Sequence, residues 1–302
     1  MLTGVIDLGS NTIRLSIYKC TKGKFSLLLN EKSFAGLAGY VQNGRLSAAG
    51  MALACETIGK YKKLCRSLNV SGLQVFATAS LRNVSNTREV AELIEEETGL
   101  RPDVLSGEDE AFFGYLGAAR SVKLKTGLYV DIGGGSTELA YFQEGTVLRQ
   151  ASVAVGCLNL FANEVGGLLP QKEERERIRA VVSAELAKLD WLQTVRADNI
   201  LGVGGTIRAL KKFSYEITGV NGGSPVDVAF LDYLLNTVGD PKGTGYRQFL
   251  KLMPDRVHTL VPGMLILDEI LSRAGTKLIY VSKYGVREGY LLARVLMGEY
   301  DA

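Results

Sequence analysis

Residues 129–140 read Tyr129-Val130-Asp131-Ile132-Gly133-Gly134-Gly135-Ser136-Thr137-Glu138-Leu139-Ala140, and this stretch decides the fold. The apolar, β-branched run that ends at Ile132 predicts a strand, and the composition after Ser136 predicts a second one. The three glycines between them predict a hairpin whose backbone enters positive-φ conformations and whose N–H groups form a concave nest around an anion. Asp131, at the strand end, adds a carboxylate that can hold a divalent cation against phosphate oxygens.

Two further stretches repeat parts of this design. Residues 5–15 carry Asp7 at a strand end, then the turn Gly9-Ser10-Asn11, then a second strand. Residues 200–207 carry the turn Gly204-Gly205-Thr206 without an Asp and lead into a helix, whose N-terminus is a favourable place for an anion. Each turn alone is also consistent with an ordinary tight hairpin. Three in one chain, two of them near-copies, favour phosphate binding by two related lobes.

Length and composition set the organisation. A chain of 302 residues with 46% hydrophobic and 22% charged residues is an ordinary globular protein, long enough for two domains. The stretch from Ser121 to Gly127 is polar, so we place the domain boundary near residue 120, with domains at 1–120 and 121–302. The formal net charge of +3 does not indicate a nucleic-acid partner, but it is compatible with a polyanionic substrate.

Several classes of protein are disfavoured. The sequence shows no run of about 20 apolar residues and no charged-then-apolar leader, since Asp7 interrupts the first apolar segment, so we expect a cytoplasmic protein with no membrane partner. The four cysteines show no C-x-x-C spacing, which argues against a zinc site. The single histidine, His258, lies in a polar helix start, which argues against Ser-His-Asp or Cys-His catalysis. No Walker loop occurs.

Two further side chains are candidates on position alone. Arg82 follows the strand Gln74–Ala77, where an arginine can fork onto phosphate oxygens or cap local carbonyls, and the sequence leaves both open. Glu110 is the third acid in the first turn of a helix that begins at Glu108. The helix dipole alone accounts for such acids, although a carboxylate beside a phosphate can also orient and deprotonate water.

The periodicity predicts an antiparallel three-stranded meander followed by helices and parallel strands, and then a second copy of this arrangement. In the first copy we expect a helix capped by Ser47 and another capped by Asn86 and running to Thr98. In the second copy we expect a long helix from Lys172 to Leu192, loops over 214–245 around one helix, and a last helix from Val286 to Met297. The strands of the two meanders are expected at Leu2–Leu8, Thr12–Cys20 and Lys24–Glu31, and from Leu128, Thr137 and Thr146.

Four motifs in order along essentially the whole chain resemble the exopolyphosphatase/guanosine pentaphosphate phosphohydrolase (Ppx/GppA) family, within the superfamily of actin, heat-shock chaperones and sugar kinases. They are Asp7-Leu8-Gly9-Ser10-Asn11-Thr12, Ser106-Gly107-Glu108-Asp109-Glu110-Ala111, Asp131-Ile132-Gly133-Gly134-Gly135-Ser136-Thr137-Glu138 and Gly285-Val286-Arg287-Glu288-Gly289. Such a resemblance implies an α/β fold of two ribonuclease-H-like, actin-like domains, with mixed sheets flanked by helices and the active site in the cleft between them.

The resemblance also implies an activity, a cofactor and site residues. The activity is hydrolysis of the terminal phosphoryl group of inorganic polyphosphate or of the 5′-phosphate of guanosine pentaphosphate, with Mg²⁺ or Mn²⁺. Glu110 matches the family's catalytic glutamate, and Arg82 an arginine that lines the cleft. Asp131 matches the acidic residue associated with the metal, and Asp7 and Glu138 are further candidates for it. The phosphate-binding set is then Gly9, Ser10, Asn11, Arg82, Gly133, Gly134, Gly135, Ser136, Gly204, Gly205 and Thr206.

Two departures and several alternatives accompany this interpretation. The chain is too short for the additional helical C-terminal region of many family members, and His258 stands where an Asp is usual. Guanosine pentaphosphate hydrolysis would need a base-and-ribose pocket, which the sequence does not locate. A sensor that binds polyphosphate or nucleotide without turnover stays open, as does a homodimer, whereas a sugar or acid kinase is disfavoured because Glu110 has no counterpart there.

Overall fold

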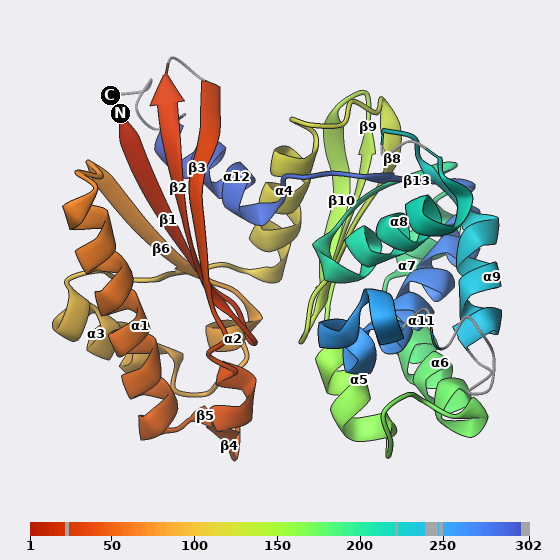
Figure 1. Cartoon of the computed structure of the whole chain (residues 1–302), viewed down its shortest axis with the longest axis horizontal. Helices are drawn as coiled ribbons and strands as arrows, with labels where there is room; N and C mark the ends of the chain where they lie inside the picture. The colour runs from red at the N-terminus through yellow and green to blue at the C-terminus, as the bar shows by residue number, and fades with distance from the viewer. Residues whose placement is uncertain (22–23, 221–222, 239–246, 248–249, 297–302) are drawn as a thin grey trace. The chain divides into compact units, whose positions relative to one another are not determined.

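The computed structural model describes residues 1–21, 24–220, 223–238, 247 and 250–296 and contains two compact units (Figure 1). Unit 1 is formed by Met1–Glu110 together with the segment that begins at Tyr290, and unit 2 by Ala111–Gly289. The chain therefore changes unit within helix α4 (Gly107–Ala118) and not near residue 120. One continuous helix crosses this point, which a search for polar linker sequence does not reveal.

Unit 1 is built on a five-stranded mixed sheet with the strand order β3-β2-β1-β6-β7. The first three strands form the expected antiparallel meander, and β6 and β7 continue it in parallel. A small hairpin of β4 and β5 follows a short 3₁₀ helix, η1. The bounds are β1 (Leu2–Leu8), β2 (Ile13–Thr21), β3 (Lys24–Ser33), η1 (Leu37–Tyr40), β4 (Val41–Gln42), β5 (Arg45–Leu46), β6 (Gly72–Ala77) and β7 (Asp103–Val104).

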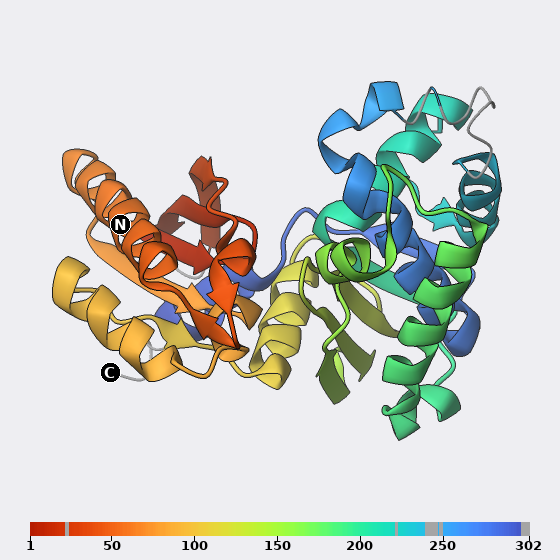
Figure 2. The same cartoon turned by 90° about the horizontal axis from the view of Figure 1, so that it is seen from below.

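Helices α1 (Ala48–Ser67) and α3 (Thr87–Thr98) lie side by side against the first sheet (Figures 1 and 2). Their apolar faces pack against alternate residues of the strands and close a core. Ile58 of α1 and Ile6 and Leu8 of β1 belong to this core. Ser47 caps α1 as expected, because its hydroxyl accepts the N–H of Gly50 at 3.4 Å. The short helix α2 (Ala79–Arg82) follows β6 directly and ends at Arg82.

Unit 2 repeats this plan with a six-stranded sheet in the order β10-β9-β8-β11-β13-β12. Its meander of β8, β9 and β10 is again antiparallel, and β11 and β13 again run parallel to β8. Both meanders thus match the sequence-based expectation, and the fold is the predicted α/β architecture of two mixed sheets with helices. The bounds are β8 (Thr126–Ile132), β9 (Thr137–Gln143), β10 (Thr146–Val153), β11 (Asn199–Val203), β12 (Val226–Asp227) and β13 (Leu278–Val281).

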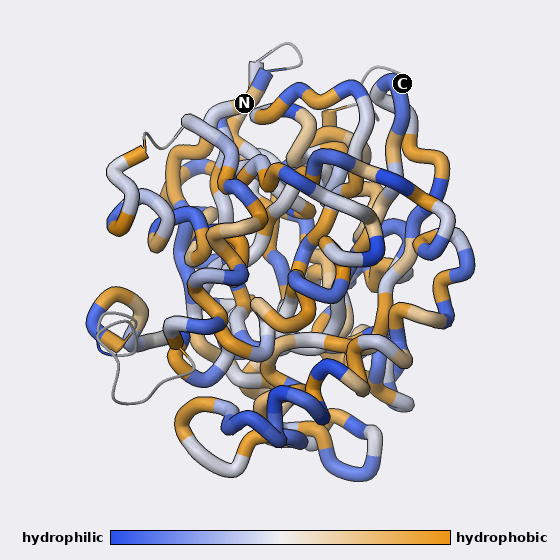
Figure 3. Tube along the Cα trace, turned by 90° about the vertical axis from the view of Figure 1, so that its right-hand side faces the viewer, coloured by the Kyte–Doolittle hydropathy of each residue, from blue (hydrophilic) through white to orange (hydrophobic). Residues whose placement is uncertain are grey.

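Alternate residues of the second sheet belong to two different cores. Val130 and Ile132 pack with the helices around α11, whereas Tyr129 packs with Tyr115 and Ala118 of α4. Side chains alternate between the faces of a strand, so α4 covers one face of the second sheet, and a group of helices around α11, named the α11 group here, covers the other face. Figure 3 colours the trace of the chain by hydropathy, with apolar residues orange and hydrophilic residues blue. The α11 group consists of α5 (Cys157–Glu164), α6 (Lys172–Ala187), α7 (Asp190–Thr194), α8 (Gly204–Thr218), α9 (Val228–Val238) and α11 (Val257–Ala274).

Three local expectations are wrong. The helix expected over 172–192 is two helices, because Leu189 leaves helical geometry between α6 and α7. Residues 214–218 are not loop, since α8 continues to Thr218. Asn86 precedes α3 but does not cap it, because its side chain bonds the backbone N–H and carbonyl of Leu46. The expected last helix from Val286 is confirmed as far as Leu296, with α-helical geometry in α12 (Val286–Tyr290) and π-helical geometry in η3 (Leu291–Leu296), and Met297 lies outside the described residues.

The helices of the described ranges include none that is both long enough and apolar enough to cross a membrane.

Candidate active site

The first acidic hairpin connects β1 and β2. Leu8 pairs with Ile13, and the N–H of Gly9 donates to the carbonyl of Thr12 at 3.1 Å, so Ser10 and Asn11 form a two-residue connection. The carbonyl oxygens of these two residues accept the N–H groups of Ala38 and Gly36, each at 2.9 Å. The backbone acceptors at this tip are therefore occupied.

The second acidic hairpin connects β8 and β9 with the same geometry. Ile132 pairs with Thr137, and the N–H of Gly133 donates to the carbonyl of Ser136 at 2.9 Å. A Cβ built on Gly133 would lie 3.0 Å from that carbonyl, and one on Gly9 would lie 3.0 Å from the carbonyl of Thr12. The two tips are thus copies of one structure.

The glycines at both tips are needed for close approach and not for a left-handed backbone. Positive φ angles occur at Gly204 and at other glycines, but not at Gly9, Gly133, Gly134 or Gly135. The expectation of positive φ in these hairpins is therefore wrong. At Gly134 the steric reason is again visible, because a Cβ there would lie 2.6 Å from Leu158 Cδ1.

The N–H groups of both two-residue connections are available to an anion. Within the ranges that the structure describes, these four amides donate to no protein acceptor; they belong to Ser10, Asn11, Gly134 and Gly135. Because the neighbouring carbonyls are taken by protein donors, each tip presents donors in excess of acceptors. Such an arrangement favours a phosphate oxygen over a cation or a neutral ligand.

Arg82 and Glu110 meet in unit 1. Arg82 Nη1 donates to Glu110 Oε2 at 2.7 Å and to the carbonyl of Leu105 at 3.2 Å. The side chains are 20% and 13% exposed, so this ion pair is largely shielded from water. The structure thus brings together the two residues that the sequence placed separately, one at the end of α2 and one in the first turn of α4.

The start of α4 is fixed by its neighbours in sequence. The N–H of Asp109 donates to Ser106 Oγ at 3.0 Å, and the Ser106 hydroxyl donates to Asp109 Oδ2 at 2.8 Å. Asp109 is therefore used by the helix cap. Glu110, one residue further along the helix, is directed to Arg82 instead.

Asp131 lies at the start of α8. A Cβ on Gly204, whose φ is 84°, would lie 2.5 Å from Asp131 Oδ1, so only a glycine leaves room for this carboxylate. Ile132 also bridges to Gly204 in parallel. The carboxylate therefore lies next to the N-terminal end of a 15-residue helix, where the helix dipole favours negative charge.

The residue opposite each strand-end Asp differs between the units. Asp131 pairs with Glu138 across β8 and β9, whereas Asp7 pairs with Arg14 across β1 and β2. Residues directly opposite in an antiparallel pair share a face, so unit 2 places two carboxylates together and unit 1 places opposite charges together. Glu138 is 2% exposed and accepts the hydroxyl of Ser152 at 2.8 Å.

Two residues of the third glycine turn have other partners. Thr206 is buried, and a Cβ on Gly263 of α11 would overlap its hydroxyl, so the Thr206 side chain faces α11. A Cβ on Gly205 would overlap the guanidinium of Arg256. Of the turn 204–206, the structure therefore brings Gly204 to Asp131 and places Arg256 against Gly205.

Three arginines near Asp131 were not singled out from the sequence. Desolvation lowers the pKa of Arg208. The positive charges of Arg256 and Arg287 lower it further, whereas the negative charges of Asp131 and Glu288 raise it. These charges therefore lie within electrostatic reach of one another in unit 2. Arg287 falls in a motif that carried the family resemblance, and Arg208 follows the third glycine turn, so position after a glycine-bearing strand end was the available signal.

The side chains fit a magnesium ion better than an all-protein metal cage. Among the described residues no group of three or more His, Cys, Asp or Glu side chains could hold a metal. Mg²⁺ in phosphoryl-transfer sites is held by one or two carboxylates and completes its shell with water and substrate oxygens. Asp131 with Glu138 opposite it has this composition.

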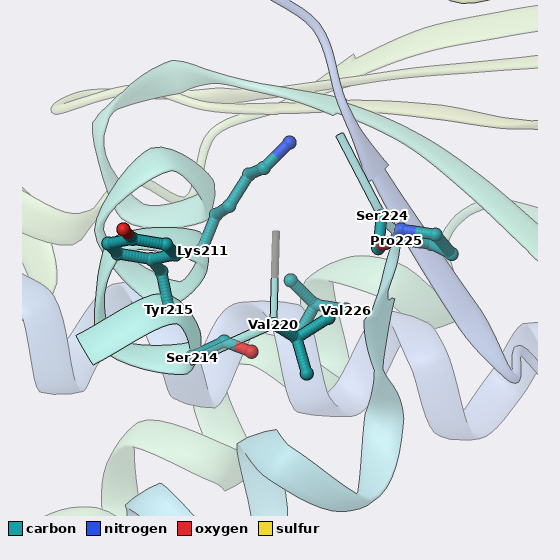
Figure 4. Close-up of a pocket in the computed structure, with 7 residues that line it drawn as sticks. All are labelled: Lys211, Ser214, Tyr215, Val220, Ser224, Pro225 and Val226. Carbon is teal, nitrogen blue, oxygen red and sulfur yellow. The ribbon is translucent and has the colours of Figure 1, made fainter. Parts of the chain in front are cut away.

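A separate hollow lies at the other end of α8 (Figure 4). It is small and opens to solvent between α8 and the segment that enters β12. Its lining residues are Lys211, Ser214, Tyr215, Val220, Ser224, Pro225 and Val226. It contains none of the candidate site residues, and Lys211 is seven positions along the helix from Gly204.

Two mixed sheets, each opened by a meander with an acidic hairpin tip, define an α/β protein of two related ribonuclease-H-like units. The family model of the Ppx/GppA phosphatase family matches residues 16–297. The chain belongs to the Ppx/GppA phosphatase family.

Individual relatives agree with this assignment over nearly full length. Exopolyphosphatase 1 of Mycobacterium leprae is 22% identical over 98% of this chain and 90% of its own, and that of Mycobacterium tuberculosis is 23% identical over 98% and 88%. The crystal structure of the Aquifex aeolicus Ppx/GppA family member superposes with a TM-score of 0.83 at 28% identity, covering 99% of this chain and 98% of its own. An exopolyphosphatase from Cytophaga hutchinsonii shares the fold at a TM-score of 0.86 and 24% identity, over 99% and 98%.

Proposed function

We propose that this protein is an exopolyphosphatase, which hydrolyses the terminal phosphoryl group of inorganic polyphosphate and releases orthophosphate. The observation that carries the proposal is the repeated hairpin tip, in which amide donors are available while the carbonyls are occupied. Amide donors of this kind suit phosphate groups, each of which carries negative oxygens. The relatives named exopolyphosphatase support the same substrate.

The amides of the two tips would hold phosphate oxygens, and Arg82 would add a charged donor. Arg82 Nη1 donates to Glu110 and to the carbonyl of Leu105. A phosphate oxygen next to this guanidinium would meet a positive charge that these bonds hold in place. Preorganised donors of this kind stabilise the charge that builds on a transferred phosphoryl group.

Glu110 would act as the general base. Its carboxylate is positioned by Arg82 and by the capped start of α4, so it is held in one orientation. A fixed carboxylate can align a water for in-line attack and accept its proton.

Asp131 is the proposed ligand for Mg²⁺ or Mn²⁺, with Glu138 as its neighbour across the strands. A bound divalent ion would neutralise charge on the phosphate oxygens. Asp7 is the weaker candidate, since Arg14 lies opposite it and supplies positive charge there. We also propose a cytoplasmic location, because all four cysteines are free thiols, which is typical of reducing compartments.

One assay tests the proposal. Phosphate release is measured in parallel from long-chain polyphosphate, guanosine pentaphosphate and ATP, each with and without Mg²⁺. An exopolyphosphatase releases phosphate fastest from polyphosphate, and only with the metal. Preference for guanosine pentaphosphate would identify the alternative substrate, whereas tight binding without release from any of the three would identify a sensor and overturn the proposal.

A further inference from the structure

The segment that enters α5 is tied to the glycine hairpin of unit 2 by several hydrogen bonds. The N–H and the thiol of Cys157 donate to the carbonyl of Gly133, at 3.0 and 3.2 Å. The N–H groups of Leu158 and Asn159 donate to the carbonyl of Gly134, at 2.9 and 3.2 Å. The side-chain amide of Asn159 donates from Nδ2 to the carbonyl of Gly135, at 3.3 Å. Every carbonyl from Gly133 to Gly135 therefore accepts a bond from residues 157–159.

The backbone of the hairpin is also in close contact with Gly156. A Cβ built on Gly156 would lie 2.5 Å from the amide nitrogen of Gly135 and would overlap the carbonyl of Gly134. Gly156 is itself extended, with φ −136° and ψ 159°, so a larger residue is excluded by contact and not by its own conformation. The segment before it is anchored as well, because the hydroxyl of Thr137 donates to the carbonyl of Val155 at 2.7 Å.

We infer that Gly156 and Asn159 are positioning residues, which set the orientation of the Gly133–Gly135 backbone so that its amides, and not its carbonyls, face a phosphate. This inference rests on the proposed function. A peptide unit that rotates exchanges its donor for its acceptor, and an acceptor directed at a phosphate repels it. The carbonyls of Gly133, Gly134 and Gly135 share their peptide units with the N–H groups of Gly134, Gly135 and Ser136, so bonds that hold these carbonyls also orient those three amides.

Unit 1 holds its tip with the element that occupies the equivalent place. There the carbonyls of Ser10 and Asn11 are held by the N–H groups of Ala38 and Gly36, which belong to the segment around η1. In both units this element follows the third strand of the meander, η1 after β3 and α5 after β10. Ala38 and Leu158, each the second residue of its helix, donate to the carbonyls of Ser10 and Gly134. This repetition is expected if holding the carbonyls serves the tip itself.

Asn159 supplies the sharpest test, because its side chain is exposed and its removal leaves no core defect. Asn159→Ala should raise KM for polyphosphate roughly 3- to 10-fold while kcat changes less than twofold, which corresponds to one lost hydrogen bond. Asn159→Asp, which keeps the shape but lacks the donor, should raise KM further. Asn159→Gln, which keeps an amide donor, should restore most of the affinity. Asn163→Ala, an exposed residue on the same helix, is the control and should leave KM unchanged.

Gly156→Ala tests the same hairpin by adding a Cβ that would press against the backbone of Gly134 and Gly135. It should raise KM more than 10-fold, whereas Gly167→Ala, where a Cβ meets nothing within 4 Å, should have no effect. Thermal unfolding is recorded for every variant, and a purely structural role would lower Tm without changing KM. Binding of tripolyphosphate by calorimetry gives a second readout that needs no turnover.

The two proposals fail in different ways. Wild-type protein that releases no phosphate from any substrate overturns the proposed function. Wild-type protein that is active, together with Asn159→Ala and Asn159→Asp variants that keep the wild-type KM and tripolyphosphate affinity, overturns the positioning role and leaves the function intact.

Discussion

Arg82 and Glu110 form a shielded ion pair, with Nη1 of the arginine 2.7 Å from Oε2 of the glutamate. Sequence position alone left each residue with two explanations, a phosphate clamp or a surface cap for Arg82, and a base or a dipole effect for Glu110. The contact joins the two, because it places the arginine that we propose to bind phosphate next to the glutamate that we propose as the general base.

Arg82→Ala should therefore lower kcat/KM for polyphosphate by roughly 10- to 100-fold, since a hydrogen bond to a charged group contributes about 1.5–3 kcal/mol. Arg82→Lys should recover only part of this loss, because lysine keeps the charge but not the planar fork. Steady-state kinetics of phosphate release provides the measurement. The matched control is Arg88→Ala, since the Arg88 side chain is 88% exposed and forms an ion pair with Glu92 one turn along the same helix. Equal losses in the two alanine variants would exclude a specific role for Arg82.

The two strand-end aspartates should differ in their effect on metal dependence. Asp131→Asn should raise the Mg²⁺ concentration for half-maximal activity by roughly tenfold or more, because it removes the proposed ligand that faces Glu138. Asp7→Asn should have a smaller effect, because Arg14 lies opposite Asp7. Titration of activity with Mg²⁺ checks both, with the exposed Asp198→Asn as the control. If Asp7→Asn had the larger effect, the metal would be assigned to the wrong unit.

Much of this could be predicted from the sequence, and the exceptions have physical reasons. The strands and the acidic turns follow from local composition, which is why both meanders end within a few residues of the expected positions. The partner of Asn86 could not be predicted, because Leu46 lies 40 residues away in the chain. The break between α6 and α7 is equally invisible, since the apolar spacing continues through Leu189.

The candidate site shows the same limit. The glycines were found from their pattern, but the reason for them is contact with carbonyls, Leu158 and Asp131, which no pattern records. Arg208 and Arg256 were overlooked because each stands in a helical segment whose neighbours in space come from distant parts of the chain. Residues that reach a site through tertiary contacts are not identified by spacing alone.

Two glycines of α1 should respond to alanine in opposite directions. At Gly59 a new Cβ meets nothing within 4 Å, so Gly59→Ala should stabilise the fold by about 0.5–1 kcal/mol through the better helix propensity of alanine. At Gly50 a Cβ would lie 2.7 Å from Leu46 Cδ1 and from Tyr40 Cβ, so Gly50→Ala should destabilise it by roughly 1–3 kcal/mol. Urea unfolding measures both. The helix packing described here would be contradicted if Gly50→Ala were as stable as wild type.

Stability should fall at alkaline pH. Burial raises the pKa of the Cys65 thiol from the ordinary value of 9.0 to about 11. Burial also raises the pKa of the Cys157 thiol from 9.0 to about 11; the positive charge of Arg256 opposes this shift, and the negative charge of Asp131 adds to it. Between pH 9 and pH 11 each of these thiols has lost its proton in the unfolded chain but keeps it in the folded chain. The contribution of these thiols is therefore complete below pH 9 and is lost as pH rises through 11.

Urea unfolding at pH 8, 9 and 10 measures how steeply the free energy of unfolding falls as pH rises. Burial also raises the pKa of Tyr61 and Tyr115, which adds to the same trend, so the cysteine contribution is isolated by Cys65→Ala and Cys157→Ala. Each variant should show a shallower loss of stability above pH 9 than the wild type. Parallel slopes in all three proteins would mean that the thiols do not contribute.

The most direct test of the account compares turnover and binding in Glu110→Gln. The amide keeps the size of the side chain but cannot accept a proton from water, so phosphate release from polyphosphate should fall by at least 1,000-fold, on the order of what a general base contributes. The affinity for polyphosphate, measured by calorimetry, should stay within about threefold, and Glu108→Gln, an exposed acid in the same helical turn, should behave as wild type. Unchanged turnover in Glu110→Gln would contradict the account.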